Sequence, residues 1–304
     1  MAQEALQGIE FTDKPSILIV ADSSAGFERA RRSAELSGCR VAGTQEVDGA
    51  AERIERQASL DAVFLDVEHD HGPPLDEILA VLQEAGETGA YGSVVSAPMA
   101  LIDRVAAQAW HRRVELVSDA DELDRAAALR MASSRPRHRL HDIGSEQGTP
   151  QLQQISEEVR RIASALERIS ADDTKHEDAP ARSGEDGACT MDAGAVRAII
   201  RARRLRDQFF GPDLFADPAW DILLDLYAAH LEKQRVAVSS LCIAAAVPAT
   251  TALRWIKTLT DIGLLVRAAD PQDGRRVYIE LAPEAAEGLR AYLGAAQRIS
   301  TLTL

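Results

Sequence analysis

Two adjacent arginines, Arg275 and Arg276, follow a Pro/Asp/Gly turn in the last third of the 304-residue chain. Short runs of β-forming residues, 264–267 and 277–281, lie on either side of that turn. Guanidinium groups bind phosphates and the edges of guanine bases, and a β-hairpin holds such groups at an exposed tip. The pattern therefore predicts a wing that contacts DNA, with a solvated hairpin tip as the alternative.

A run of polar and basic residues at helical spacing precedes this hairpin. The segment from 248 to about 263 opens with proline, and Leu253, Ile256 and Leu259 repeat at the spacing of a buried helix face. The remaining face carries hydroxyl and cationic side chains, which donate hydrogen bonds to phosphates and base edges. This face is expected to enter the major groove of DNA. Its residues are Thr250, Thr251, Arg254 and Lys257.

Two further helices are predicted before this segment. Asp217 and Pro218 provide the start of a helix that runs to about residue 232, and Ser239 or Ser240 starts a short second helix. A tight turn at 246–248 then leads into the third helix. A short helix, a tight turn and a helix with a polar, partly basic face together make a helix-turn-helix.

Residues 247–265 and the motif Asp-Pro-Gln-Asp-Gly-Arg-Arg at 270–276 closely resemble the winged helix-turn-helix of MarR-type transcriptional regulators. The family pattern D-x-x-D-G-R-R, followed by a strand and a C-terminal helix, is present in full. The resemblance covers roughly residues 191–300. It implies that Asp273 orients an arginine and that Arg275, with Arg276, reaches the minor groove or phosphates.

The same resemblance implies a symmetric dimer that forms through the helices flanking this region, 192–210 and 283–300. Such a dimer would bind a roughly palindromic site with half-sites about 10 bp apart. The first flanking helix carries five arginines, which either approach phosphates or form a solvated or acid-paired face. They are Arg197, Arg201, Arg203, Arg204 and Arg206.

Short apolar runs alternate with amphipathic segments in the first 131 residues. The predicted strands are 16–21, 40–43, 62–65, 93–96 and 114–117. The predicted helices are 26–36, 50–57, 75–85, 99–110 and 120–131. Continuous apolar strands between such helices indicate a parallel sheet that is covered on both faces. We therefore expect a doubly wound α/β (flavodoxin-like) domain over residues 14–131.

This order of elements resembles the receiver domain of two-component response regulators. Asp66, at the end of the third predicted strand, matches the phosphoacceptor. Asp22 matches one member of the acidic pair that holds Mg²⁺, while Ala21 replaces the other. Ser96 matches the hydroxyl residue that senses the phosphoryl group. The resemblance thus implies a receiver-like pocket formed by Asp22, Asp66 and Ser96.

The chain departs from the receiver pattern at the fifth predicted strand. Ser118 stands where that family has an essential lysine, and no lysine occurs between Lys14 and Lys175. A cation that would neutralise an aspartyl phosphate is therefore missing, and an arginine has a different geometry. We expect a pseudo-receiver that serves dimerisation, signal sensing or binding of a regulatory protein. A phosphorylation switch at Asp66 is the alternative.

A heptad repeat lies between the two domains. Linkers are predicted at 132–149 and 171–190, and the segment 150–170 between them carries apolar residues at alternating spacings of three and four. This pattern favours a short two-stranded coiled coil, with an amphipathic helix packed on one of the domains as the alternative. The repeat consists of Leu152, Ile155, Val159, Ile162, Leu166 and Ile169.

Charge is distributed unevenly along the chain, whose net charge is -14. Residues 1–189 contain 20 Lys+Arg and 35 Asp+Glu, whereas residues 190–304 contain 14 and 13. The acidic excess therefore belongs to the first part, and the near-neutral second part remains compatible with DNA binding. We expect a cytoplasmic protein, because the start is polar and no apolar run approaches the roughly 20 residues of a membrane span.

No catalytic constellation, cofactor motif or metal-binding cysteine spacing is found in the sequence. Glu68, His69, Asp70 and His71 follow Asp66 and are interpreted as a polar loop, with a divalent metal or a pH-sensitive contact as the alternative. The sequence predicts a homodimeric, DNA-binding transcriptional regulator over residues 191–304, joined to the receiver-like domain, and not an enzyme. The alternatives are a response regulator switched at Asp66 and a protein-interaction adaptor that no longer binds DNA.

Overall fold

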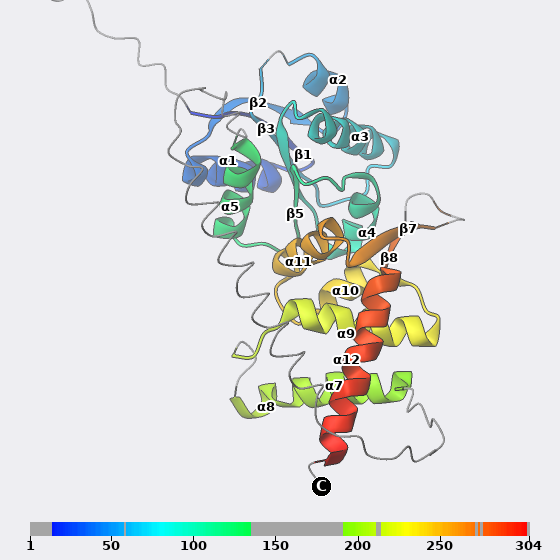
Figure 1. Ribbon diagram of the computed structural model, residues 1–304. Coiled ribbons are helices and arrows are strands. Elements are labelled where there is room, and N and C mark those ends of the chain that lie inside the picture. Colours follow the sequence, from blue (N-terminus) through cyan, green and yellow to red (C-terminus); the bar gives the residue numbers. More distant parts are fainter. Residues whose placement is uncertain are drawn as a thin grey trace, which may run out of the picture. The chain divides into compact units, whose positions relative to one another are not determined.

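The computed structural model describes residues 14–57, 59–134, 191–210, 214–270, 273 and 276–302 (Figure 1). Three predicted features lie outside the described residues. They are the heptad repeat of 152–169, the two linkers (apart from residues 132–134 of the first), and Arg275. We call residues 14–134 the α/β region and residues 191–302 the winged-helix region. Both belong to one compact unit of the chain.

Five parallel strands form the sheet of the α/β region, in the order β2-β1-β3-β4-β5. The strands are β1 Ser16–Ala21, β2 Arg40–Glu46, β3 Ala62–Asp66, β4 Gly92–Ser96 and β5 Val114–Val117. The helices are α1 Ser24–Ser37, α2 Ala50–Glu55, α3 Pro73–Thr88, α4 Met99–Gln108 and α5 Glu122–Ser133. Every strand and helix predicted for this region is present, and most of their ends differ by one to three residues.

Helices cover both faces of this sheet (Figure 1). On one face, Ile19, Phe64 and Val94 pack with residues of α1 and α5 such as Leu129. The residues that alternate with them along the strands belong to a second cluster, which includes residues of α2, α3 and α4. Successive side chains of a strand point to opposite faces, so burial of both faces requires nearly continuous apolar strands. The predicted parallel α/β sheet is therefore confirmed.

The winged-helix region contains six helices and three strands among its described residues. The helices are α7 Ala193–Leu205, α8 Asp207–Phe210, α9 Pro218–Glu232, α10 Val238–Ala244, α11 Ala249–Asp261 and α12 Pro283–Leu302. The strands are β6 Val236–Ala237, β7 Leu265–Ala269 and β8 Val277–Leu281. They form an antiparallel sheet in the order β6-β8-β7. The single helix predicted over 192–210 is divided into α7 and α8.

Local chemistry explains the helix-turn-helix within this region. Asp217 caps α9 by accepting a hydrogen bond from the Trp220 N–H. Ala246 adopts a left-handed φ of 53° between α10 and α11, and Gly263 does so with φ 79° just after α11. Leu253 and Ile256 are buried on the inner face of α11. The turn and the β7–β8 hairpin thus complete a winged helix-turn-helix.

In the described part of the chain, no single helix has both the length and the apolar character needed to cross a membrane. One bent pair, α10 with α11, meets that test by length and composition only.

Candidate functional site

The predicted recognition helix α11 packs against the α/β region. Thr250, in its first turn, is 1% exposed. Its hydroxyl accepts a hydrogen bond from the Ser118 N–H at 3.2 Å and donates one to the Ser118 carbonyl at 3.1 Å. Ser118 directly follows β5, so two bonds fix the start of α11 to the edge of the parallel sheet.

Lys257 makes a second contact of the same kind, two turns further along α11. Its Nζ donates hydrogen bonds to the carbonyl of His111 and, at 2.6 Å, to the carbonyl of Val114. Burial lowers the pKa of the Lys257 ammonium below its ordinary value, although the nearby carboxylates of Glu115 and Asp261 oppose that shift. The cation therefore serves backbone groups at the start of β5 and is largely withdrawn from solvent.

Arg254 lies between these two residues on α11. Its Nε and one of its terminal nitrogens are buried and have no hydrogen-bond partner among the described residues. A buried donor without an acceptor costs about 1–3 kcal/mol, and more when the group is charged. Thr251, the neighbouring predicted residue, is only partly exposed. All four predicted α11 residues are thus partly or fully covered.

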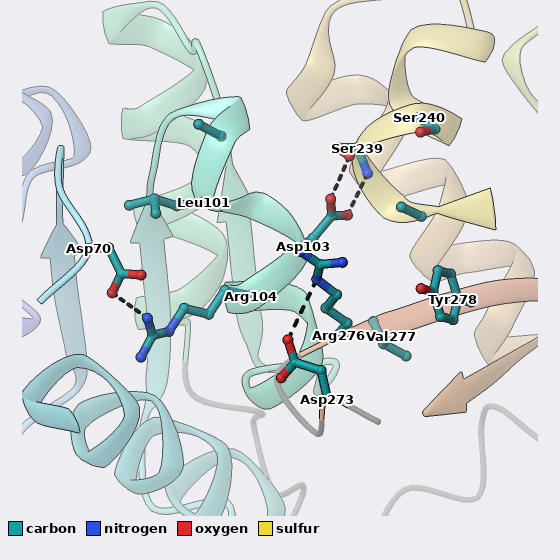
Figure 2. Close-up of a pocket in the computed structure, with 12 residues that line it drawn as sticks. Asp70, Leu101, Asp103, Arg104, Ser239, Ser240, Asp273, Arg276, Val277 and Tyr278 are labelled. Carbon is teal, nitrogen blue, oxygen red and sulfur yellow. Dashed lines mark hydrogen bonds and ion pairs between the residues drawn. The ribbon is translucent and has the colours of Figure 1, made fainter. Parts of the chain in front are cut away.

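Asp103 of α4 is hydrogen-bonded to α10, the first helix of the helix-turn-helix (Figure 2). Its carboxylate accepts hydrogen bonds from the Ser239 N–H at 2.8 Å and from the Ser239 hydroxyl at 2.6 Å. The N-cap residue of α10 is Ala237, which makes no side-chain cap. The first N–H groups of a helix have no acceptor within the helix. Asp103, from the α/β region, supplies an acceptor for one of these N–H groups, that of Ser239.

Arg267 of β7 makes the reciprocal contact at the end of α4. It donates hydrogen bonds to the carbonyls of Ala106 and Ala107 at 2.7 and 3.2 Å, and its guanidinium lies 5.3 Å from the centre of the Trp110 ring. Cations near a helix C-terminus bind the carbonyls that the helix leaves without donors. Each region therefore satisfies a helix end of the other.

A pocket of about 550 Å³ lies beside these contacts (Figure 2). Arg104 projects from α4 and pairs with Asp70 and, at 2.7 Å, with Asp76. Arg276 projects from the base of the wing, 3.6 Å from Asp273, and its side chain is 66% exposed. Arg276 is therefore the most accessible of the five predicted DNA-contacting residues that the structure describes.

The carboxyl edge of the parallel sheet carries a separate cluster of charged groups. Asp66 ends β3, its side chain is 2% exposed, and its Oδ1 lies 2.7 Å from the guanidinium of Arg29 on α1. Arg29 also pairs with Glu68 at 2.6 Å. The hydrogen bond to Asp66 is the main cause that raises the pKa of Arg29. Ser96 lies beside Asp66 in the register of β3 and β4.

Asp22 is a second buried carboxylate at this edge. Its Oδ2 accepts hydrogen bonds from the N–H groups of Glu68 and His69 at 2.8 and 3.0 Å and lies 3.1 Å from His71 Nε2. Burial raises the pKa of Asp22, but these hydrogen bonds outweigh burial and hold the pKa below its ordinary value. Asp22, Glu68 and His69 place three ligand atoms within 4.8 Å of one another, a spacing that suits a divalent cation.

The sequence did not indicate that Arg29 would be the cation beside Asp66. The two residues are 37 positions apart in the sequence, and no local pattern connects α1 with the end of β3. One feature was available: Arg29 lies early in the helix that follows β1, and that end of α1 adjoins the carboxyl edge of the sheet. Ser118, which follows β5, uses its backbone to hold Thr250.

Most arginines of the predicted flanking helix α7 have partners within the winged-helix region. Arg197 pairs with Asp225 and, at 3.0 Å, with Glu232. Arg203 pairs with Asp221 at 2.9 Å, and Arg204 donates to the Ala244 carbonyl. Arg197 and Arg203 are therefore paired with acidic residues. This was one of the two interpretations of the arginines on this helix.

Several exposed apolar side chains occur close together in the sequence, at the end of α7 and in the residues that follow it. The ring centres of Phe210 and Phe215 lie 5.6 Å apart. Large apolar side chains at a protein surface mark interaction sites when they cluster. We call this set the aromatic patch, and it consists of Leu205, Phe209, Phe210, Leu214 and Phe215.

Several solved structures are similar to part of this chain. MepR of S. aureus in a DNA-binding conformation is 20% identical with a TM-score of 0.25, covering 35% of this chain and 75% of that one. A probable transcriptional regulator from Pseudomonas aeruginosa is 28% identical with a TM-score of 0.24, covering 34% and 74%. MarR is 20% identical with a TM-score of 0.24, covering 37% and 81%.

No protein-family model matches the chain, and no curated protein does. The similar solved structures named above include transcriptional regulators, and each similarity extends over about a third of this chain.

Proposed function

We propose that this protein is a DNA-binding transcriptional regulator of the MarR type, with α11 as its recognition helix. The observation that carries the proposal is the order of α10, a tight turn, α11 and the β7–β8 hairpin, with hydroxyl and cationic side chains along one side of α11. Thr250, Arg254 and Lys257 are separated by four and three residues, which places them on one helix face.

Roles follow from the chemistry of each residue. Arg254 and Lys257 suit guanine edges or phosphates, and Thr250 and Thr251 suit thymine methyl groups or phosphates. Arg275 and Arg276 belong to the wing, where they reach the minor groove or phosphates. The acidic pairing of Arg197 and Arg203 on α7 leaves α11 and the wing as the basic elements best suited to DNA.

We further propose that the protein acts as a homodimer on a pseudo-palindromic operator. The aromatic patch supports this assembly, because Phe209 and Phe210 are 72% and 64% exposed and adjoin α7. Burial of one phenylalanine side chain contributes about 1.5–3 kcal/mol. The heptad repeat over 150–170 is proposed as a second contributor to the dimer.

The α/β region is proposed to be a pseudo-receiver that senses a signal or partner without conventional phosphorylation. Its strand order 2-1-3-4-5 is the flavodoxin-like order that receiver domains share. Asp66 matches the phosphoacceptor position by resemblance, and the guanidinium of Arg29 lies 2.7 Å from its carboxylate. Since a guanidinium binds a carboxylate tightly and in a fixed plane, it disfavours attack by Asp66 on a phosphoryl donor.

Titration of the full-length protein against fragmented DNA from its own source tests this function, at low salt and at about 150 mM salt. We expect sequence-selective binding with a steep salt dependence, since phosphate contacts release counterions. Arg276→Ala should weaken binding, whereas Arg32→Ala, which removes the same charge from α1, should not. Weak binding that lacks preference and vanishes with salt would favour a protein-interaction adaptor.

A further inference from the structure

We propose that the α/β region is an intramolecular competitor of DNA, which occupies the recognition face of α11 in the conformation described here. DNA binding then requires the α/β region to separate from α11. This inference rests on the proposed function, because it assigns regulation to the same recognition helix. Its partner surface is the α4–β5 edge of the chain's own α/β region.

The two occupants of α11 need the same atoms. The Thr250 hydroxyl both donates to and accepts from the backbone of Ser118, and Lys257 Nζ donates to the carbonyls of His111 and Val114, just before and at the start of β5. A recognition helix must also enter a major groove about 12 Å wide and 8.5 Å deep. A five-stranded domain packed on that face excludes the DNA, so the two complexes are mutually exclusive.

Charge makes the α/β region a suitable substitute for DNA. Its residues 14–134 contain 12 Lys+Arg and 21 Asp+Glu, a net charge of -9. At the contact it presents the Asp103 carboxylate to Ser239 and backbone carbonyls to Lys257 and Arg267. These acceptors correspond chemically to phosphate and base oxygens, so the same donors serve either partner.

Arg254 indicates that this contact is suited to opening. Its Nε and one terminal nitrogen are buried without acceptors in the described part of the protein, and the Nε of Arg267 is in the same state. A permanent core rarely retains such groups, because each buried donor without an acceptor is costly. DNA offers Arg254 the acceptors that the α/β region does not.

Substitutions at Asp103 test the inference, because this residue belongs to the α/β region and not to the proposed DNA-binding set. Asp103→Ala removes both bonds to Ser239 and should raise the DNA affinity of the full chain roughly tenfold, or about 1.4 kcal/mol. Asp103→Asn keeps an oxygen acceptor and should have a smaller effect. Asp48→Ala removes the same charge from an exposed site and should leave affinity unchanged. Equal gains for all three would attribute the effect to charge alone and overturn the proposal.

A reversible cross-link gives the opposite test. Asp103→Cys with Ser239→Cys, in a full-length background whose native cysteines are replaced by alanine, joins α4 to α10 when oxidised. We expect oxidation to reduce DNA affinity at least roughly tenfold and reduction to restore it. Equal affinity in the oxidised and reduced forms would show that DNA binds without separation, and the proposal would fall.

Hydrogen exchange at the Ser118 amide separates failure of this inference from failure of the proposed function. That amide is bonded to Thr250 Oγ1, so it should exchange faster in Asp103→Ala and in the DNA complex. If the Ser118 amide exchanges faster in Asp103→Ala but no variant binds DNA, the proposed function is refuted, whereas the contact between α11 and the α/β region is still supported. Tight DNA binding with Ser118 still protected would refute occlusion alone.

Discussion

The guanidinium of Arg29 lies 2.7 Å from the carboxylate of Asp66, although the two residues come from different elements of the α/β region. Asp66 is nearly inaccessible, whereas the Arg29 side chain is 32% exposed. The cation beside Asp66 at the end of β3 is therefore an arginine from α1. The sequence has no lysine between Lys14 and Lys175 that could take this place. This pairing has consequences for stability and for phosphorylation.

Removal of Arg29 should destabilise the α/β region. In Arg29→Ala the buried Asp66 loses its cationic donor, and a hydrogen bond to a charged group is worth about 1.5–3 kcal/mol. Arg31→Ala is the matched control, because Arg31 is 52% exposed and pairs with exposed Glu28 at 3.7 Å. Such a surface pair contributes about 0–1 kcal/mol. Urea unfolding measures the loss of stability in both variants, and equal losses would mean that the Asp66 pair contributes no more than an exposed surface pair.

Asp66 should not accept a phosphoryl group from a small-molecule donor. Arg29 occupies the carboxylate, and no lysine stands at position 118 to neutralise the product. Incubation with labelled acetyl phosphate and Mg²⁺ should give no stable incorporation at Asp66. Label that appears in the wild type and disappears in Asp66→Asn would support the phosphorylation switch instead.

Acidification should loosen the contact between α11 and the α/β region. Burial, and then the positive charge of Lys257, lowers the pKa of His111 below its ordinary value of 6.5; Arg112 and Arg113 act in the same direction, and Glu87 opposes them. The part of this shift that depends on the contact is the charge of Lys257 from α11, so the packed form favours neutral His111 through that charge. Its stability is fully present above about pH 6.5 and declines as the pH falls through that value toward the lowered pKa.

Exchange at the Ser118 amide, corrected for its intrinsic pH dependence, measures this loosening. His111→Gln should remove the response, since glutamine does not titrate. His230→Gln on α9 is the matched control and should retain it. A response that persists in His111→Gln would assign it to another group.

The aromatic patch should contribute to the dimer. Phe210→Asp places a charge among apolar side chains, and loss of one buried phenylalanine should weaken dimerisation roughly 10- to 100-fold. Leu36→Asp on α1 is a suitable control, because Leu36 is apolar and 54% exposed. Sedimentation equilibrium measures both. An unchanged dimer in Phe210→Asp, with dissociation in Leu152→Asp, would assign assembly to the heptad repeat.

Two glycine-to-alanine substitutions should have opposite signs. A Cβ on Gly92, at the start of β4, would lie 2.1 Å from the Ala132 carbonyl oxygen. Overpacking of this kind costs about 1–3 kcal/mol. A Cβ on Gly288, within α12, would meet nothing within 4 Å, and alanine should stabilise that helix by about 0.5–1 kcal/mol. Thermal unfolding compares the two, and equal signs would contradict this explanation.

Local patterns in the sequence were enough to predict most of the elements, but neither the short strand β6 nor the division of 192–210 into α7 and α8 was predicted. Apolar runs predicted four of the five strands of the α/β region, a weaker pattern over 40–43 predicted β2, and the Asp-Gly turn with its flanking β-forming runs predicted the hairpin. Capping residues next to a helix predicted where some helices begin, as Asp217 does for α9. These signals act over a few residues, so no tertiary information was needed.

Contacts between distant residues were not predictable in this way. Thr250 meets Ser118, and Lys257 meets Val114, across 132 and 143 residues. The pattern on α11 gave a polar face, but a polar face suits carbonyls of another region as well as it suits phosphates. Periodicity fixes which side of a helix is polar and does not name its partner.

The bond from Asp103 to Ser239 makes α10 dependent on an acceptor that lies 136 residues earlier in the chain. A molecule that binds Ser239 in place of this carboxylate competes with the α/β region for α10. Binding at α10 or α11 and binding at the released α4–β5 edge are then linked, and each changes the affinity of the other by the same factor. Under the proposed competition, any ligand that holds the freed α4–β5 edge raises the affinity of α11 for DNA by the factor with which DNA raises the ligand's own affinity. One helix end thereby couples two binding equilibria.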